Sequence, residues 1–174
     1  MKRLKRIFSI VLVLILTVSI LTMPASASLG TQFKTAISNF PTRSTAYSNT
    51  FDGYTCVIQR FLWAYDDDGD NEGTRPIIAR SGVDGYYGEY TELAVKTFQL
   101  QKGLDVDGKT GSATWTEIAS LLTTLSTSKT EIIIGCNGYE VIYVMRSYAD
   151  IDVDYIYFYY TGDTEPVKGG SFYS

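Results

Sequence analysis

Apolar residues recur at helical spacing in three segments in the middle of the chain. The apolar stripes consist of Ile58, Phe61, Leu62 and Tyr65 in the first segment, Ala94, Val95 and Phe98 in the second, and Trp115, Ile118, Leu121 and Leu122 in the third. Such spacing places the apolar side chains on one face of each helix. We therefore expect three short helices that pack into a compact unit over residues 54–125, whose thin core depends on good turns and caps.

After the third helix the pattern changes period, and apolar and polar residues alternate. The runs 131–136 and 139–146 flank the dipeptide Asn137-Gly138, and a third alternating run covers 151–161. An Asn-Gly pair between two such runs is typical of a two-residue β-hairpin turn. The three runs predict a three-stranded antiparallel β-meander.

The chain also contains an internal repeat. Residues 83–91 align with residues 106–114 at an offset of 23, and five of the nine positions are identical, namely Val, Asp, Gly, Gly and Thr. The Asp-Gly pair predicts a tight turn in which Asp bonds nearby backbone amides and Gly adopts a positive φ, while the second Gly allows close approach to a helix start. The Thr falls in the first turn of that helix, where its hydroxyl can serve otherwise unpaired amides.

The N-terminal segment has the features of a secretory signal peptide. Four basic residues lie within positions 2–6, an apolar run covers 7–23, and small residues occupy Ala25 and Ala27. This combination predicts export with cleavage after Ala27, and the alternative is an uncleaved membrane anchor. Cleavage leaves 147 residues and removes four of the 15 basic residues and none of the 19 acidic ones, so the formal charge changes from -4 to -8. We expect a secreted protein, extracellular or associated with the cell wall, with no stable membrane span after cleavage.

These patterns together predict an α+β fold. Its parts are a signal peptide over 1–27, an N-terminal arm or linker over 28–53, the three-helix unit over 54–125, the β-meander over 130–162 and a loose tail over 163–174. The arm is polar, and a short helix is compatible with its residues 31–39.

The composition excludes several kinds of site. The chain contains no histidine, so it cannot form by itself a Ser/His/Asp or Cys/His nucleophile site or an HExxH zinc site. The acidic charge and the lack of a basic face argue against nucleic acid as a partner. Cys56 and Cys136 form either a disulfide, which would stabilise by roughly 4 to 5 kcal/mol, or two buried thiols.

Several ordered motifs carry a resemblance to a known family. They are Ile58-Gln59 with Leu62; Val83-Asp84-Gly85-Tyr86-Tyr87-Gly88 with Thr91; Ala94-Val95-Lys96-Thr97-Phe98-Gln99 with Gly103-Leu104; and Val106-Asp107-Gly108-Lys109-Thr110-Gly111 with Thr114-Trp115. Over residues 55–122 this set resembles the small three-helix peptidoglycan-binding domain carried by many bacterial cell-wall hydrolases. The chain departs from the family in a long acidic excursion over 66–82 and in Glu89, which stands where the family usually has proline.

The resemblance implies a three-helix peptidoglycan-binding-like bundle with no catalytic residues and no cofactor. Its partner would be peptidoglycan, held by its glycan or its stem peptide around the repeated turns and the adjoining helix starts. The residues that correspond by motif position, together with the neighbouring Tyr90, are Asp84, Tyr86, Tyr87, Tyr90, Thr91, Gln99, Asp107 and Trp115. The tyrosines are the strongest of these, because aromatic rings stack on sugars or contact peptides at little entropic cost.

The acidic excursion raises a weak calcium hypothesis. Asp66, Asp68 and Asp70 alternate like the first ligands of an EF-hand. Asn71 stands where that loop needs glycine, and Ile77 stands where it needs the bidentate glutamate. The main prediction is therefore a solvated acidic loop with no metal.

Two other functions remain open as alternatives. One is a small carboxylate-dependent enzyme that cleaves peptidoglycan, with acidic residues of the C-terminal part as candidates: Glu131, Glu140, Asp150, Asp152 and Asp154. Such a thin sheet cannot easily enclose a cleft that raises a carboxylate pKa. The other is a regulatory partner of a separate cell-wall hydrolase, which would bind protein through the β-meander and its aromatic strip 155–160.

Overall fold

The computed structural model describes residues 29–65, 73–128, 131–146, 154–158 and 167–171. The expected signal peptide over 1–27 and the hypothetical calcium ligands Asp66, Asp68 and Asp70 lie outside the described residues. Among the helices that are described, none has both the length and the apolar character needed to cross a membrane.

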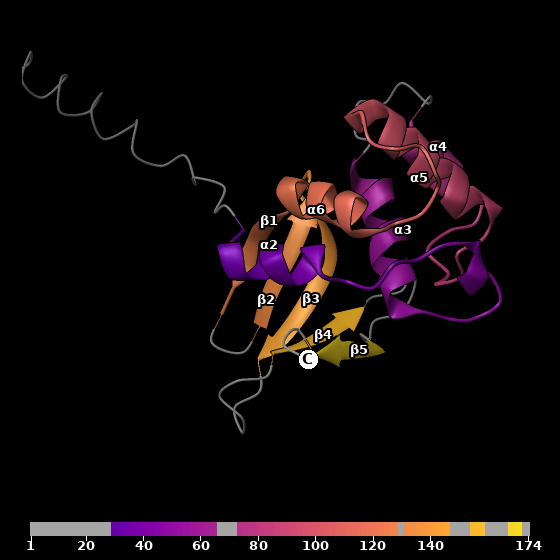
Figure 1. Cartoon of the computed structure of the whole chain (residues 1–174). Coiled ribbons are helices and arrows are strands. Elements are labelled where there is room, and N and C mark those ends of the chain that lie inside the picture. Colours follow the sequence, from indigo (N-terminus) through magenta and orange to yellow (C-terminus); the bar gives the residue numbers. More distant parts are fainter. Residues whose placement is uncertain (1–28, 66–72, 129–130, 147–153, 159–166, 172–174) are drawn as a thin grey trace, which may run out of the picture.

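Helices precede strands along the chain (Figure 1). The helical elements are α2 (Thr31–Ser38), the 3-10 helix η1 (Thr45–Tyr47), α3 (Gly53–Tyr65), α4 (Thr74–Ile78), α5 (Glu89–Lys102) and α6 (Ser112–Leu121). The strands are β1 (Thr123–Thr127), β2 (Glu131–Cys136), β3 (Tyr139–Arg146), β4 (Asp154–Phe158) and β5 (Val167–Ser171). This order confirms the predicted α+β fold.

The three helices predicted from the apolar stripes are α3, α5 and α6. Helix α5 ends at a left-handed glycine, because Gly103 adopts φ 66° and the amide of Leu104 donates to the carbonyl of Gln99 at 2.9 Å. Helix α4 lies within the segment expected to be an acidic loop, and Thr74 at its start donates its hydroxyl to the carbonyl of Leu62 at 2.6 Å. The excursion therefore includes a helical turn tied to the end of α3.

The sheet is an antiparallel meander in the order β1-β2-β3-β4-β5. Strands β2, β3 and β4 are the three predicted from the alternating pattern. Asn137 and Gly138 join β2 to β3 with φ values of 49° and 81°, as a hairpin turn with two left-handed residues requires. The sheet also contains β1 and β5, which the sequence analysis did not predict, and β5 corrects the expectation of a loose tail over 163–174.

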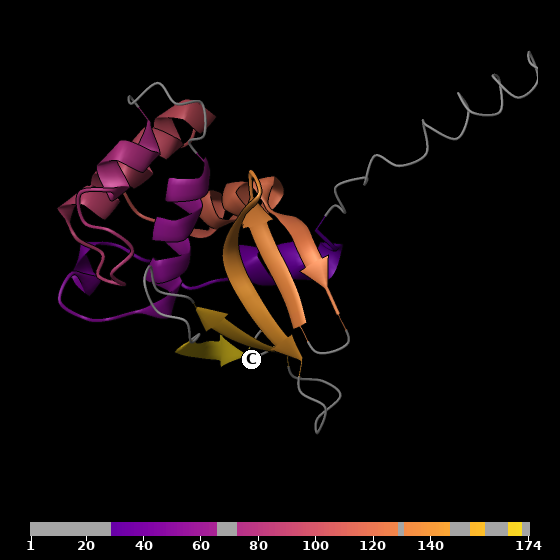
Figure 2. The same cartoon turned by 180° about the vertical axis from the view of Figure 1, so that it is seen from behind.

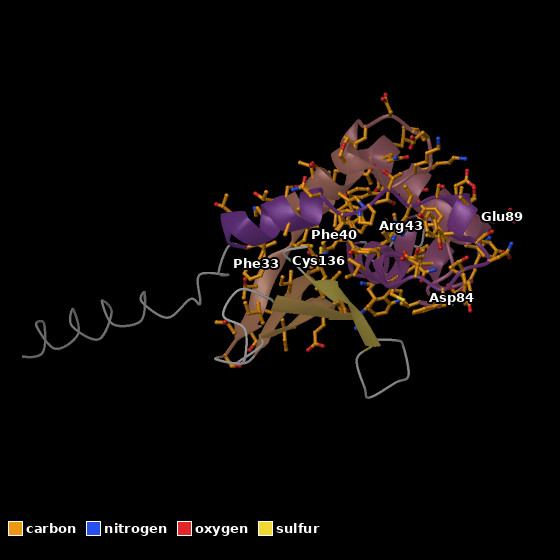
Figure 3. All side chains as sticks on the ribbon, turned by 60° about the horizontal axis from the view of Figure 1, so that its bottom comes forward. Phe33, Phe40, Arg43, Asp84, Glu89 and Cys136 are labelled. Atoms are coloured by element: carbon orange, nitrogen blue, oxygen red, sulfur yellow. The ribbon has the colours of Figure 1, made fainter. Side chains whose placement is uncertain are left out.

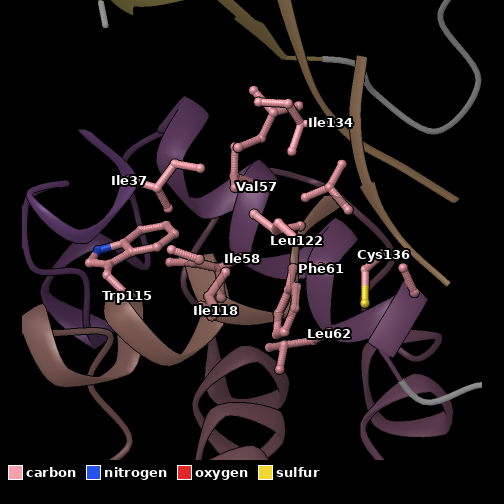
Figure 4. Close-up of a cluster of buried hydrophobic side chains, with 14 of the residues drawn as sticks. Ile37, Val57, Ile58, Phe61, Leu62, Trp115, Ile118, Leu122, Ile134 and Cys136 are labelled. Carbon is pink, nitrogen blue, oxygen red and sulfur yellow. The ribbon is translucent and has the colours of Figure 1, made fainter. Parts of the chain in front are cut away.

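Helices and sheet share one hydrophobic core. Figure 4 shows Ile37 of α2, Val57 and Phe61 of α3, Trp115 of α6 and Ile134 of β2 in one cluster, and each of these side chains is fully buried. The views from the front and from behind agree that α2 and α6 lie together on one face of the β1–β3 part of the sheet (Figures 1 and 2). The small helical unit therefore gains core from the sheet and from α2.

The N-terminal segment is held against the domain by the side chain and backbone of Arg43. Its guanidinium forms a bidentate ion pair with Asp52, with Nε to Oδ2 at 2.6 Å and Nη2 to Oδ1 at 2.9 Å. The same guanidinium lies over the rings of Tyr47 and Tyr54, at 4.4 and 4.8 Å from their centroids. The backbone of Arg43 pairs with Thr110 through two hydrogen bonds. Packed in this way, residues 40–52 belong to the domain.

Figure 3 shows where Arg43 lies in the molecule. Phe33 and Cys136 mark the side of the sheet, Asp84 and Glu89 mark the opposite end, and Arg43 lies between them. Through its backbone pairing with Thr110 and its contact with the ring of Tyr54, Arg43 attaches the N-terminal segment to the second repeated turn and to α3.

The two cysteines are buried thiols that the structure does not join in a disulfide. This arrangement corresponds to the second of the two alternatives left open by the sequence. Burial, followed by the negative charges of Asp52 and Asp84, raises the pKa of the Cys56 thiol to about 12. The thiolate form is therefore suppressed at neutral pH, which makes Cys56 an inert packing residue.

We predict that Arg43→Ala lowers the free energy of unfolding by about 3 kcal/mol, because Asp52 is left as a nearly buried charge without its partner. Urea denaturation of the mature chain measures this change. The matched control is Lys96→Ala, which removes an exposed ion pair with Glu92 on the surface of α5 and should cost less than about 0.5 kcal/mol. Equal losses in the two variants would contradict the structural role of Arg43.

Candidate ligand-binding surface at the repeated turns

The first repeated turn is held by the side chain of Gln59, which α3 places in the interior. Its amide nitrogen donates to the Asp84 carboxylate at 2.8 Å, to the carbonyl of Tyr86 at 3.2 Å and to the hydroxyl of Thr91 at 3.0 Å. Its carbonyl oxygen accepts from the backbone amides of Asp84 at 3.0 Å and Gly85 at 2.9 Å. Gln59 is fully buried and uses both ends of its amide on this turn.

The second repeated turn is held in the same way by Gln99, on α5. Its amide nitrogen donates to the Asp107 carboxylate at 2.9 Å, to the carbonyl of Lys109 at 2.9 Å and to the hydroxyl of Thr114 at 3.1 Å. Its carbonyl oxygen accepts from the amide of Gly108 at 2.9 Å. The internal repeat in the sequence is thus a repeat of one hydrogen-bond network.

Gln59 is a structural residue that the sequence reasoning left out of the site. Gln99 precedes its aspartate by 8 residues, whereas Gln59 precedes Asp84 by 25. The difference comes from the excursion between α3 and the first turn. Because of it, a comparison of the chain with itself at the offset of the two turns does not align Gln59 with Gln99. The shared pattern of an apolar residue followed by glutamine, Ile58-Gln59 and Phe98-Gln99, was the signal that could have found it.

The two turns are also connected to each other by Tyr87. Its hydroxyl donates to the carbonyl of Gly108 at 2.9 Å and lies 3.2 Å from the hydroxyl of Thr110. Burial raises the pKa of Tyr87 far above its ordinary value, so the phenol stays protonated and remains a donor. In the same region Trp115 donates its indole N–H to the carbonyl of Pro41 at 3.2 Å.

The eight residues predicted for ligand binding fall into two groups. Most take part in internal contacts. Tyr87, Thr91 and Trp115 are fully buried, and Gln99 is 2% exposed. The carboxylates of Asp84 and Asp107 accept hydrogen bonds within the two glutamine networks. The threonine hydroxyls accept from the glutamine amides, which corrects the expectation that they serve unpaired helix amides. Tyr86 and Tyr90 remain at the surface, with exposed fractions of 42% and 37%.

Tyr86 and Tyr90 lie at the first turn and at the start of α5, and each has a neighbour that limits its motion. The ring of Tyr86 meets that of Phe51 edge to face, with centroids 6.2 Å apart. The guanidinium of Arg80 lies 5.7 Å from the ring centroid of Tyr90. We call Phe51, Arg80, Tyr86 and Tyr90 the turn surface.

The electrostatics of the second turn are set by the Gln99 network. Although partial burial acts to raise it, the pKa of Asp107 is held below its ordinary value by hydrogen bonds from the Lys109 amide and from Gln99. Asp107 is therefore ionised at neutral pH and acts as a fixed acceptor within the turn. Within the described part of the chain no three Cys, Asp or Glu residues lie close enough together to hold a metal ion.

Comparison with known proteins agrees with this geometry. Residues 57–118, which include both glutamines and both turns, match the family described as putative peptidoglycan binding domain. This segment is a peptidoglycan-binding domain. The N-acetylmuramoyl-L-alanine amidase CwlL of Bacillus licheniformis is 52% identical over 42 residues, which cover 24% of this chain and only 12% of the amidase. No solved structure matches the chain.

We predict that Gln99→Leu destabilises the peptidoglycan-binding domain by about 3 kcal/mol, because the buried amide of Gly108 and the acceptors on Asp107 and Lys109 lose their partner. Thermal or urea unfolding measures the loss. Gln101→Leu, which changes an exposed glutamine two residues further along α5, is the matched control and should stay within about 0.5 kcal/mol of wild type. A Gln99 variant as stable as this control would refute the network.

We further predict that Asp107 contributes to the pH dependence of stability. Its pKa is lowered in the folded state, so its contribution is present above its unfolded pKa of about 4 and is lost as the pH falls through the folded value. The free energy of unfolding should therefore drop less between pH 7 and pH 3 in Asp107→Asn than in wild type. Asp105→Asn, outside the Gln99 network, is the control and should follow wild type.

Proposed function

We propose that the protein is an exported, non-catalytic cell-wall protein that attaches to peptidoglycan through its helical domain. The match of residues 57–118 to the peptidoglycan-binding family supports peptidoglycan as the ligand. The basic residues and the apolar run within residues 1–27 support export. Attachment would come from specific contacts, because a strongly acidic protein gains no general attraction to an anionic wall.

The observation that carries the proposed binding site is the exposure of Tyr86 and Tyr90. At the offset of 23 their counterparts in the second repeat are Lys109 and Ala113, so the aromatic rings occur at one turn only. Both rings extend from backbone that the Gln59 network holds rigid. Aromatic side chains fixed in this way lose little entropy when they contact a sugar or a stem peptide.

The absence of catalysis is part of the proposal. Glycan cleavage by two carboxylates needs one acid whose pKa is raised, so that it carries a proton at neutral pH. Asp107 is shifted in the opposite direction, and Glu140 is exposed to solvent. The amidase relative leaves hydrolysis as the alternative to test, and a regulatory role toward a separate hydrolase would act through protein contacts instead.

The proposed site predicts that Tyr86→Ala and Tyr90→Ala each weaken attachment to insoluble peptidoglycan about tenfold, and more when combined. Co-sedimentation of the mature chain with purified peptidoglycan measures this loss. Leu100→Ala is the control, because Leu100 is 71% exposed on α5 and lies three turns from Tyr90. Recovery of wild-type protein entirely in the supernatant would overturn the proposed function.

The same preparation tests for hydrolysis. The turbidity of a cell-wall suspension should stay constant in the presence of the mature chain, while a known cell-wall hydrolase clears it. Clearing by the wild-type chain that is lost in Glu140→Gln would favour the enzymatic alternative.

A further inference from the structure

A small open pocket lies between the helical domain and the sheet. It is lined by Arg60 and Trp63 of α3, by Val83, and by Tyr139 and Glu140 of β3, with a volume of about 110 Å³. Residues 139 and 140 lie beyond the segment that matches the peptidoglycan-binding family. The pocket therefore includes residues outside that segment. The β2–β3 hairpin that carries them lies beside α3 (Figure 2).

Two aromatic rings form a corner at the mouth of this pocket. The rings of Trp63 and Tyr139 have centroids 5.0 Å apart and planes at 83°, and each side chain is 37% exposed. The guanidinium of Arg75 lies 4.5 Å from the Trp63 ring and 5.1 Å from the Tyr139 ring, and its Nε donates to the carbonyl of Trp63 at 2.7 Å. Arg75 thus contacts both rings, and both residues remain partly exposed to solvent.

The hairpin that supplies Tyr139 is fixed to α3 by hydrogen bonds. The side-chain amide of Asn137 donates to the carbonyls of Ala64 at 3.1 Å and Tyr65 at 2.9 Å, which lie at the end of the helix. The Nε of Arg60 donates to the backbone carbonyl of Glu140 at 3.2 Å. The relative position of the two rings is therefore set before any ligand arrives, which lowers the entropic cost of binding.

The shape and charge of the pocket indicate the kind of ligand. Its volume is far below the ~300 to 1,000 Å³ of sites for drug-sized ligands, so it accommodates one ring or one small group. One basic and one acidic side chain, Arg60 and Glu140, line the pocket, and the guanidinium of Arg75 lies over both rings of the corner. Together they offer donors and an acceptor to a polar, uncharged ligand. The two aromatic faces suit a ring with apolar C–H faces and polar edges. A pyranose with an acetamido group combines these properties.

We propose that this pocket is a sugar subsite that holds one N-acetylhexosamine ring of the peptidoglycan glycan. The identity of the glycan rests on the proposed attachment to peptidoglycan, whereas the preference for a neutral pyranose rests on the pocket itself. Trp63 and Tyr139 pack against the faces of the ring, and the carboxylate of Glu140 accepts from its hydroxyl or amide groups. The stem peptide stays outside this pocket.

The two tryptophans of the chain make the proposal testable by fluorescence. Trp63 is 37% exposed and Trp115 is fully buried, so a change in emission on adding a sugar reports on Trp63. The probe is the β-1,4-linked trimer of N-acetylglucosamine, which carries no peptide. Titration of the mature chain should give a saturable blue shift of the emission.

The variants then place the sugar. Tyr139→Ala should weaken trimer binding about tenfold, Tyr139→Phe should bind within about twofold of wild type, and Leu100→Ala, at an exposed position of α5 outside both proposed sites, should leave trimer binding unchanged. Circular dichroism checks that each variant is folded. No saturable response up to about 10 mM trimer, or an unchanged affinity in Tyr139→Ala, would overturn the subsite.

Three further outcomes distinguish this proposal from the proposed function, and glycan from stem peptide. Sedimentation with peptidoglycan but no response to the trimer would overturn the subsite and leave the proposed function in place. A trimer response with no sedimentation would support the pocket and overturn attachment to peptidoglycan. A saturable shift caused by a sugar-free stem peptide, with none from the trimer, would overturn the assignment to glycan.

Discussion

The buried primary amides of Gln59 and Gln99 are the interactions on which the helical domain depends. A primary amide offers two N–H donors and a carbonyl acceptor, which match the carboxylate, backbone amides and hydroxyl that each Asp-Gly turn presents. Because a buried polar group without a partner costs more than a hydrogen bond gains, each turn can lie in only one place relative to its helix. Tyr87 then links the first turn to the second, so that the starts of α5 and α6 are fixed together.

This constraint separates the scaffold from the proposed binding surface. Two of the five positions at which the repeats are identical, Asp84 with Asp107 and Thr91 with Thr114, carry side chains that serve the glutamine networks. The aromatic residues that can reach a ligand occur where the repeats differ, at Tyr86 and Tyr90. The internal repeat therefore marks the framework, and the proposed ligand contacts lie where the two repeats differ.

The same reasoning explains which parts of the fold the sequence revealed. The hairpin was predictable to its end residues, because alternating runs flank an Asn-Gly turn that only left-handed backbone satisfies. Strand β1 was missed because Thr123–Thr127 has a single large apolar residue and hence no alternation to detect. The burial of Arg43 was equally hidden, since its partners Asp52 and Thr110 become neighbours only after the chain has folded.

The aromatic corner follows from the way α3 ends. The last carbonyls of a helix lack partners within the helix, and here the side chain of Asn137 supplies donors to two of them, Ala64 and Tyr65. Once the hairpin turn is held at that point, Tyr139 lies two residues after the contact and Trp63 lies just before it, so the two rings must meet. The sheet therefore does more than enlarge a thin core, because docking it on α3 creates a surface that neither part presents alone.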